Sequence, residues 1–211
     1  MAERDSAIDC RLVPIRLLLA SSSAGKLREY RALAADSVLD LDLLPNFREL
    51  VGFEETAPTF AENAVGKALY YGRFTDELLM AEDSGLVVPA LDGAPGVYSA
   101  RYAGLRGTDA DCVRKLLRAM EGKKGNERRA RFVCVIAVVR RGRALAVVSD
   151  FVEGIIIEEP RGSNGFGYDP IFLLPDIGRT SAEVSRDEKN RLSHRGKAFR
   201  KIRDILTNSS F

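Results

Sequence analysis

Histidine and cysteine are both scarce in this sequence. Of the 211 residues, one is histidine, His194, and three are cysteines, Cys10, Cys112 and Cys134. A single histidine excludes a metal site built from several histidines. The three cysteines are widely spaced and match neither a disulfide framework nor a zinc site, so we expect all three to be reduced and structural.

Long hydrophobic runs and an excess of one charge are also absent. The longest apolar run covers residues 132–139 and is far shorter than the ~20 residues that span a bilayer. The 32 basic and 30 acidic residues leave a net charge of +2, so no global field attracts nucleic acid or an anionic membrane. The acidic start of the chain lacks the pattern of a secretory leader, so the cytoplasm is the expected compartment. We expect no membrane association and no stable nucleic-acid partner.

One local basic stretch, residues 123–143, holds eight Lys or Arg residues. A solvated surface and a weak RNA-binding surface would both explain it. We favour solvation, because no aromatic residues interleave with the basic ones outside the apolar run.

The order of the apolar segments predicts an α/β fold. An apolar run at residues 15–20, a helical stretch at 24–35, a β-rich run at 38–44 and a helix from 59 to about 75 alternate as βαβα. No repeat, linker or break in composition divides the chain. We therefore expect one two-lobed unit over residues 15–207, preceded by a flexible extension at 1–14 and followed by a tail at 208–211.

Local signals place the remaining elements. Residues 78–81 have the pattern of a short buried strand that ends at Glu82-Asp83-Ser84-Gly85, with extended structure resuming at 86–88. Residues 108–120 have the apolar spacing of an amphipathic helix, and residues 132–139 and 144–157 predict a long hairpin. The glycine-rich segment 162–170 must be a shaped loop. Capping patterns at residues 59–62 and 185–188 predict helix starts, and Ser193 predicts the start of a final helix that reaches about residue 206.

Familiar reaction classes fail simple tests. No Gly-x-Ser-x-Gly elbow accompanies the histidine, which excludes a common type of serine hydrolase. The Gly25-Lys26 pair lacks the first glycine of a Walker A loop and is followed by Leu27 where a hydroxyl belongs. In the segment 165–170, Pro170 stands where a dinucleotide fingerprint has its third glycine.

The remaining polar residues suit phosphate chemistry. Residues 20–26 place three serines and Lys26 at a predicted helix N-terminus, which favours an anion. Asn63 and Lys67 share one face of the next helix. Taken one at a time, an ordinary serine-rich turn and a solvated lysine are the favoured explanations of these residues.

Two carboxylate pairs, Glu54-Glu55 and Glu82-Asp83, offer oxygen ligands of the kind that magnesium prefers. Neighbouring side chains in extended backbone point to opposite faces, so we expect one of each pair to face a shared site. His194 and Arg195 fall in the first turn of the final helix, where the helix dipole disfavours positive charge unless an anion is near. With Lys189 they form a basic cluster that surface solvation would also explain.

Four segments together resemble one family, the inosine/xanthosine triphosphate pyrophosphatases, which remove non-standard purine nucleotides. These segments are residues 19–26, residues 54–68, residues 81–86 with 95–101, and residues 165–172 with 193–196. They occur in the family's order, and the resemblance extends from about residue 15 to 206. It implies a long, mixed, twisted sheet flanked by helices, two lobes with a central nucleotide cleft, and a homodimer.

The resemblance also implies roles for individual residues. The triphosphate would lie against Ser21, Ser22, Ser23, Ala24, Gly25 and Lys26, with Ser84 also contacting substrate. The catalytic group would be Asp83, Lys67, Lys26 and Glu55. Glu54 and Asp83 would hold Mg²⁺, for which Mn²⁺ could substitute. The purine pocket would consist of Phe166, Gly167, Tyr168, Asp169, Lys189, His194 and Arg195.

The implied reaction is hydrolysis between the α and β phosphates, with Asp83 accepting a proton from water. The chain departs from the family at Ser21-Ser22-Ser23, where Thr-x-Asn is usual, and it also has Ala57 for glycine and Glu82 for aspartate. Serines in the first loop are shared with Maf-type nucleotide pyrophosphatases, which lack the Gly-Phe-Gly-Tyr-Asp-Pro segment. A Maf-type enzyme with another base preference is the first alternative. A non-catalytic nucleotide- or RNA-binding protein is the second.

Overall fold

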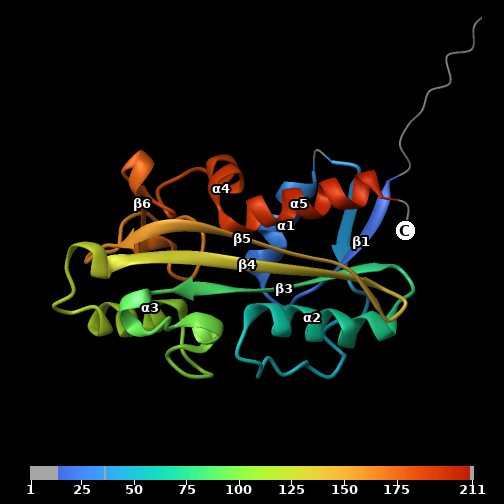
Figure 1. The fold of residues 1–211 in the computed structure, drawn as a ribbon, viewed down its shortest axis with the longest axis horizontal. Helices are drawn as coiled ribbons and strands as arrows, with labels where there is room; N and C mark the ends of the chain where they lie inside the picture. Colours follow the sequence, from blue (N-terminus) through green and yellow to red (C-terminus); the bar gives the residue numbers. More distant parts are fainter. Residues whose placement is uncertain (1–13, 36, 210–211) are drawn as a thin grey trace, which may run out of the picture.

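A single long sheet forms the centre of the molecule, with helices on both faces (Figure 1). The computed structural model describes residues 14–35 and 37–209. The elements are β1 (Ile15–Ala20), α1 (Ala24–Ala34), β2 (Leu39–Leu43), α2 (Phe60–Tyr71), β3 (Leu78–Val87), η3 (Gly96–Arg101), α3 (Asp109–Ala119), β4 (Arg129–Arg140), β5 (Arg143–Ile156), β6 (Phe172–Leu174), β7 (Arg179–Thr180), α4 (Arg186–Leu192) and α5 (His194–Asn208), with further short 3-10 turns.

The seven strands follow the order β2-β1-β3-β4-β5-β6-β7. β1 is parallel to β2 and β3, whereas the pairs from β3 to β7 are antiparallel. The parallel pairs are joined by helical crossovers. Among the antiparallel pairs, β3 and β4 are connected through α3, whereas β4 and β5 are joined by a tight turn. That turn places Arg141 and Gly142 at φ 49° and 73°, the left-handed backbone that a two-residue hairpin turn requires. The predicted mixed sheet flanked by helices is confirmed.

Three apolar clusters hold the sheet and helices together in two lobes. In the first lobe, α1 and α5 pack on one face of the sheet around Tyr30 and Phe199, while α2 packs on the other face around Tyr71. The second lobe is built from α3, the far ends of the long strands and β6, packed around Leu116 and Phe172. Figure 1 shows α1 and α5 above the sheet and α2 and α3 below it.

β3 is the element that positions the site. Its first residues pair with β1, and the last pair joins Ala20 to Ala81. Beyond that point β1 has ended, and β3 continues with β4 alone as far as Val87. The chain leaves β1 for β2 on one side, while β3 lies on the other. The carboxyl end of β1 is therefore the kind of topological switch point where α/β sheets bind ligands.

The prediction of a short strand ending at Glu82 is wrong, because β3 runs without a break from Leu78 to Val87. The pattern suggested an interruption because polar residues within a buried strand usually lack partners. Glu82 and Asp83 are nevertheless buried and are satisfied by side chains from other elements. They lie within the strand rather than at its end.

The other predicted elements are present with small differences in their bounds. Thr59, Thr108, Ser185 and Ser193 cap the helices that follow them, each accepting a backbone N–H with its side chain. The short strands β6 and β7 were not predicted. Cys112 and Cys134 are free and buried, whereas Cys10 and the predicted extension, apart from Pro14, lie outside the described residues, as does the end of the tail. No helix in the described part of the chain has the length and hydrophobicity that a bilayer crossing requires.

Candidate active site

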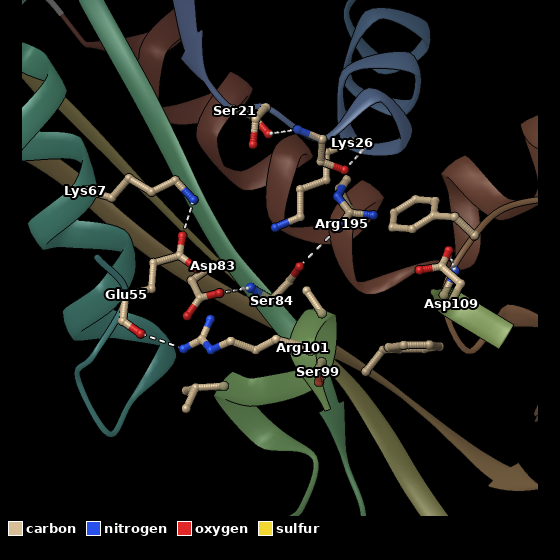
Figure 2. Close-up of a pocket in the computed structure, with 18 of the residues that line it drawn as sticks. Ser21, Lys26, Glu55, Lys67, Asp83, Ser84, Ser99, Arg101, Asp109 and Arg195 are labelled. Carbon is tan, nitrogen blue, oxygen red and sulfur yellow. Dashed lines mark hydrogen bonds and ion pairs between the residues drawn. The ribbon is translucent and has the colours of Figure 1, made fainter. Parts of the chain in front are cut away.

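A cavity of about 760 Å³ opens between the lobes, at the end of β1. Most of the residues predicted for the site line it. They are Ser21, Ser22, Ser23, Lys26, Glu55, Lys67, Asp83, Ser84, Phe166, Gly167, Tyr168, Asp169, Lys189, His194 and Arg195. Ala24, Gly25 and Glu54 are not among the lining residues. Figure 2 shows Lys67, Asp83 and Glu55 on one side of the cavity and Asp109 on the other.

The loop from β1 into α1 forms part of one wall. Ser23 caps α1, and its Oγ accepts a hydrogen bond from the Lys26 amide at 3.3 Å. The Ser21 Oγ accepts the Ser23 amide at 3.2 Å. The loop thus brings hydroxyls and the N-terminus of an 11-residue helix to the cavity, an arrangement suited to phosphate.

Gly25 lies behind this wall and serves packing. A Cβ atom there would come within 2.7 Å of Cδ1 of Phe166, so the missing side chain lets the ring approach α1. Helix α1 therefore presents Lys26 at one end of the cavity and packs against the ring of Phe166 at the other end. A direct substrate contact of Gly25 or Ala24 remains a prediction.

Asp83 is held in a defined orientation. Its Oδ2 accepts a hydrogen bond from Nδ2 of Asn63 at 3.0 Å, and its Oδ1 accepts the Ser84 amide at 2.9 Å. Burial, together with the negative charge of Glu55, raises the pKa of Asp83 to about 6. The carboxylate is therefore ionised at neutral pH, oriented, and more basic than an ordinary aspartate.

Lys67 and Glu55 stand beside Asp83. The Lys67 ammonium donates to the Glu55 carboxylate and to the main-chain carbonyl of Glu82 at 3.0 Å. Of the two carboxylate pairs, Glu55 and Asp83 line the cavity, while Glu54 and Glu82 do not. The prediction that one member of each pair faces the cavity is confirmed.

Two carboxylates are available for a divalent cation. Among the described residues no three His, Cys, Asp or Glu side chains cluster as a complete metal site. Asp83 and Glu55 are close enough for the charge of Glu55 to raise the pKa of Asp83. Two neighbouring carboxylates in a cavity fit a hard cation that takes its other ligands from phosphate and water, as magnesium does. Glu54 is exposed, and its predicted role as a metal ligand stays a prediction.

The opposite end of the cavity is aromatic and cationic. The Phe166 ring has Nζ of Lys189 at 5.1 Å and Cζ of Arg195 at 5.5 Å from its centroid. Lys189 donates to Asp169, whose Oδ2 also accepts the Phe166 amide at 2.8 Å. These contacts fix the loop around Phe166. An aromatic ring flanked by two cations is suited to stack against a planar heterocycle.

His194 supplies an unpartnered polar atom at this end. Its ring stacks on Phe132 with centroids 4.9 Å apart, and burial, aided by the charge of Arg195, lowers its pKa well below the ordinary range. The imidazole is therefore neutral. Within the described residues, its Nδ1 is the one buried side-chain N or O atom without a hydrogen-bond partner. Such an atom in a cavity indicates a ligand that would satisfy it.

Arg195 is almost completely buried, with 2% of its surface exposed. It pairs with Glu29 and binds both carboxylate oxygens of Glu82, with Nε at 2.9 Å and Nη2 at 2.7 Å. Burial opposes ionisation of Glu82, but the adjacent charge of Arg195 holds its pKa well below the ordinary range. The positive charge in the first turn of α5 is explained by these two carboxylates.

Several residues at the site escaped prediction. Glu29 pairs with Lys189 at 2.7 Å, and Asp109 accepts the Gly167 amide at 2.7 Å. Arg101 donates to the Glu55 carbonyl at 2.6 Å. Arg101 could have been predicted, because it is the last residue of one of the segments that carried the family resemblance. Glu29 and Asp109 had no local signal, since their partners lie far away along the chain.

Comparison with known proteins agrees with this geometry. The model of the Ham1 family matches residues 17–205. The chain belongs to the Ham1 family. A Ham1 relative from Geobacillus kaustophilus, named dITP/XTP pyrophosphatase, is 48% identical over 186 residues, which cover 88% of this chain and 91% of the relative.

Solved structures of similar proteins have the same fold. The structure of a HAM1 protein from Coxiella burnetii aligns with a TM-score of 0.81 at 42% identity, covering 92% of this chain and all of that one. A structure from Mycobacterium abscessus, titled nucleoside-triphosphatase and dITP/XTP pyrophosphatase, aligns with a TM-score of 0.71 at 38% identity and covers 89% of this chain and 98% of that one.

Proposed function

We propose that this protein hydrolyses non-standard purine nucleoside triphosphates, namely ITP, dITP and XTP, to the monophosphate and pyrophosphate. The observation that carries the proposal is that the two ends of one cavity differ in chemistry. Serine hydroxyls, Lys26, Lys67 and Asp83 line one part of it, and Phe166, Lys189 and His194 line another. A nucleotide has matching polarity, with an anionic tail and a planar base. The names of the Ham1 relatives support the same substrate class.

At the phosphate end, Asp83 accepts the proton of the attacking water while Lys26 and Lys67 stabilise charge on the phosphoryl oxygens. The oriented, raised-pKa carboxylate of Asp83 suits a base that must be ionised near neutral pH. Asp83 and Glu55, with Glu54 as a further candidate, would hold a magnesium ion, or manganese in its place. When bound, this ion would polarise the phosphates and the water.

At the base end, the ring of Phe166 stacks on the purine, and the polar groups of Lys189, His194 and Arg195 read its edge. The 6-oxo group of hypoxanthine and xanthine accepts hydrogen bonds, whereas the amino group of adenine donates them. Adenine would therefore leave buried donors unpaired, which is costly.

The reaction type is tested by its products. With a divalent cation present, we expect ITP to give the monophosphate and one pyrophosphate per turnover, measured by ion-exchange chromatography. Addition of a chelator should abolish turnover and leave the circular dichroism spectrum unchanged, because the core does not depend on the ion. Release of orthophosphate and diphosphate instead would contradict the proposal. Absence of any product with ITP would favour the non-catalytic alternative, and a preference for nucleotides with other bases would favour a Maf-type activity.

Three broader expectations belong to this proposal. The pyrophosphatase domain would comprise residues 15–207. The protein would form a homodimer, which light scattering on the purified protein can measure. It would act in the cytoplasm without a stable nucleic-acid partner, because its substrates are free nucleotides.

A further inference from the structure

One buried carboxylate contacts cations from both ends of the cavity. Glu82 has 1% of its surface exposed and does not line the cavity. Its side chain binds Arg195 through both oxygens, and its Oε1 lies 3.4 Å from Nζ of Lys26. Its main-chain carbonyl accepts Lys67 at 3.0 Å.

These three cations come from three different helices. Lys26 lies on α1, Lys67 on α2 and Arg195 on α5. In the proposed function, two of them act on phosphate and the third acts on the base. Asp83, the proposed base catalyst, is the next residue along β3. We propose that Glu82 is a positioning residue that holds the base-reading Arg195 and the phosphate-binding Lys26 in register with each other and with Asp83.

A purely stabilising ion pair explains the arrangement less well. Buried ion pairs contribute little net stability, because desolvation offsets their attraction. The carboxylate of Glu82 is instead shared between two cations that both line the cavity. Long cationic side chains in a cavity have many rotamers, and a shared anchor removes that freedom before substrate binds.

Glutamine tests the role with little change in shape. The amide has one acceptor oxygen, so the Arg195 fork keeps one of its two bonds and meets an N–H donor in place of the other. Lys26 loses its ionic partner, while the contact of Lys67 with the main-chain carbonyl is unaffected. Aspartate keeps the charge, although it is one methylene shorter, and serves as the conservative variant.

The inference rests on the proposed function, and the readout is chosen to separate the two. The ratio of kcat/KM for ITP to that for ATP does not depend on the folded fraction of a preparation. We expect Glu82→Gln to lower this ratio ~10-fold or more. It should also lower kcat ~10-fold for ITP and for ATP alike, the scale that misplacement of reacting groups produces. Glu82→Asp should remain within about fivefold of wild type in both quantities, because its charge is kept.

Glu29→Gln is the matched control. Glu29 is a buried carboxylate that pairs with Arg195 and Lys189, and no ion pair joins it to Lys26 among the described residues. Glu29→Gln should lower the ITP-to-ATP ratio, because Glu29 holds Arg195 and Lys189. It should not lower kcat for both nucleotides, because Glu29 does not hold Lys26. In the Arg195→Lys background, Glu82→Gln should cause less than about a twofold further change in the ratio, because it acts through Arg195.

The outcomes are distinguishable. Failure of the wild-type protein to release pyrophosphate from ITP would overturn the proposed function itself. Normal wild-type activity with an unchanged ITP-to-ATP ratio in Glu82→Gln would leave that function standing and overturn the positioning role. The same conclusion would follow if Glu82→Gln only lowered the melting temperature, or if its effect on the ratio simply multiplied that of Arg195→Lys.

Discussion

Replacement of Asp83 by asparagine is expected to lower turnover of ITP at least ~10²-fold, because it removes the proton acceptor and one charge from the proposed metal site. The same change should make the metal-free protein more stable at neutral pH. Burial and Glu55 raise the pKa of Asp83 from 3.8 to about 6. The ionised carboxylate therefore lowers stability by up to about 3 kcal/mol above that pH, at ~1.4 kcal/mol for each pH unit.

The sign follows from the direction of the pKa shift. A carboxyl whose pKa is raised by folding contributes stability below its unfolded pKa and loses that contribution as the pH rises through the folded value. The melting temperature of Asp83→Asn should therefore exceed that of wild type at pH 7.5 without divalent cations, and the difference should vanish below pH 4. The gain should be less than the full amount, because one amide oxygen replaces two acceptors for Asn63 and the Ser84 amide.

Asp92→Asn is a suitable control for charge removal, since Asp92 is exposed and outside the cavity. It should leave turnover unchanged. Near-native activity in folded Asp83→Asn would show that another group accepts the proton. A melting temperature of Asp83→Asn below that of wild type at neutral pH would show that the surroundings of Asp83 do not destabilise its ionised carboxylate in the folded state.

ITP and XTP are expected to be preferred over ATP by ~10² or more in kcat/KM, the scale that unpaired buried polar groups can supply. Arg195→Lys keeps the charge but loses the planar fork, so it should reduce this preference mainly by weakening the favoured substrates. Lys26→Ala should reduce turnover of all triphosphates by the same factor. The contrast follows from the proposed positions, because Arg195 would contact the base of the substrate, whereas Lys26 would contact only its phosphates.

Arg195→Ala is the more drastic variant and should also reduce the preference. It removes the arginine partner of two buried carboxylates and leaves Glu29 with Lys189 and Glu82 with Lys26. Removal of one partner from a buried ion pair typically costs about 3–5 kcal/mol. The ratio of kcat/KM values for ITP and ATP is therefore the measurement to use for both variants. If Arg195→Lys and Arg195→Ala slow both nucleotides equally, Arg195 does not read the base.

The fold was largely predictable because its signals are local. Capping residues such as Thr59 and Ser193 and the spacing of apolar residues mark where helices begin and which face is buried. The two-residue turn at Arg141 likewise marks the hairpin. β3 was predicted incorrectly because its polar residues are satisfied by side chains from distant helices, and β6 and β7 are too short to show a periodic pattern.

Residues of the site were predictable only where they belong to a recognisable sequence motif. The serine loop, Lys67, Asp83 and the glycine-rich loop stood out as groups of chemically suited residues. The pairing of Arg195 with Glu29 and Glu82 depends on α5 packing against α1 and β3, which no local pattern records. Sequence reasoning therefore found many side chains that line the cavity more readily than the buried carboxylates that hold them in place.

The strand order described above also bears on how the chain folds. β4 and β5 are joined by a two-residue turn, whereas β1 must find β3 across the intervening β2 and α2. Contacts between near neighbours form faster than contacts that close long loops. In pulse-labelled hydrogen exchange during refolding, amides of the hairpin should therefore be protected before those of β1. The end of β1, where the serine loop meets Asp83, is then assembled late, and a newly made chain gains catalytic competence only after its longest-range strand pairing has closed.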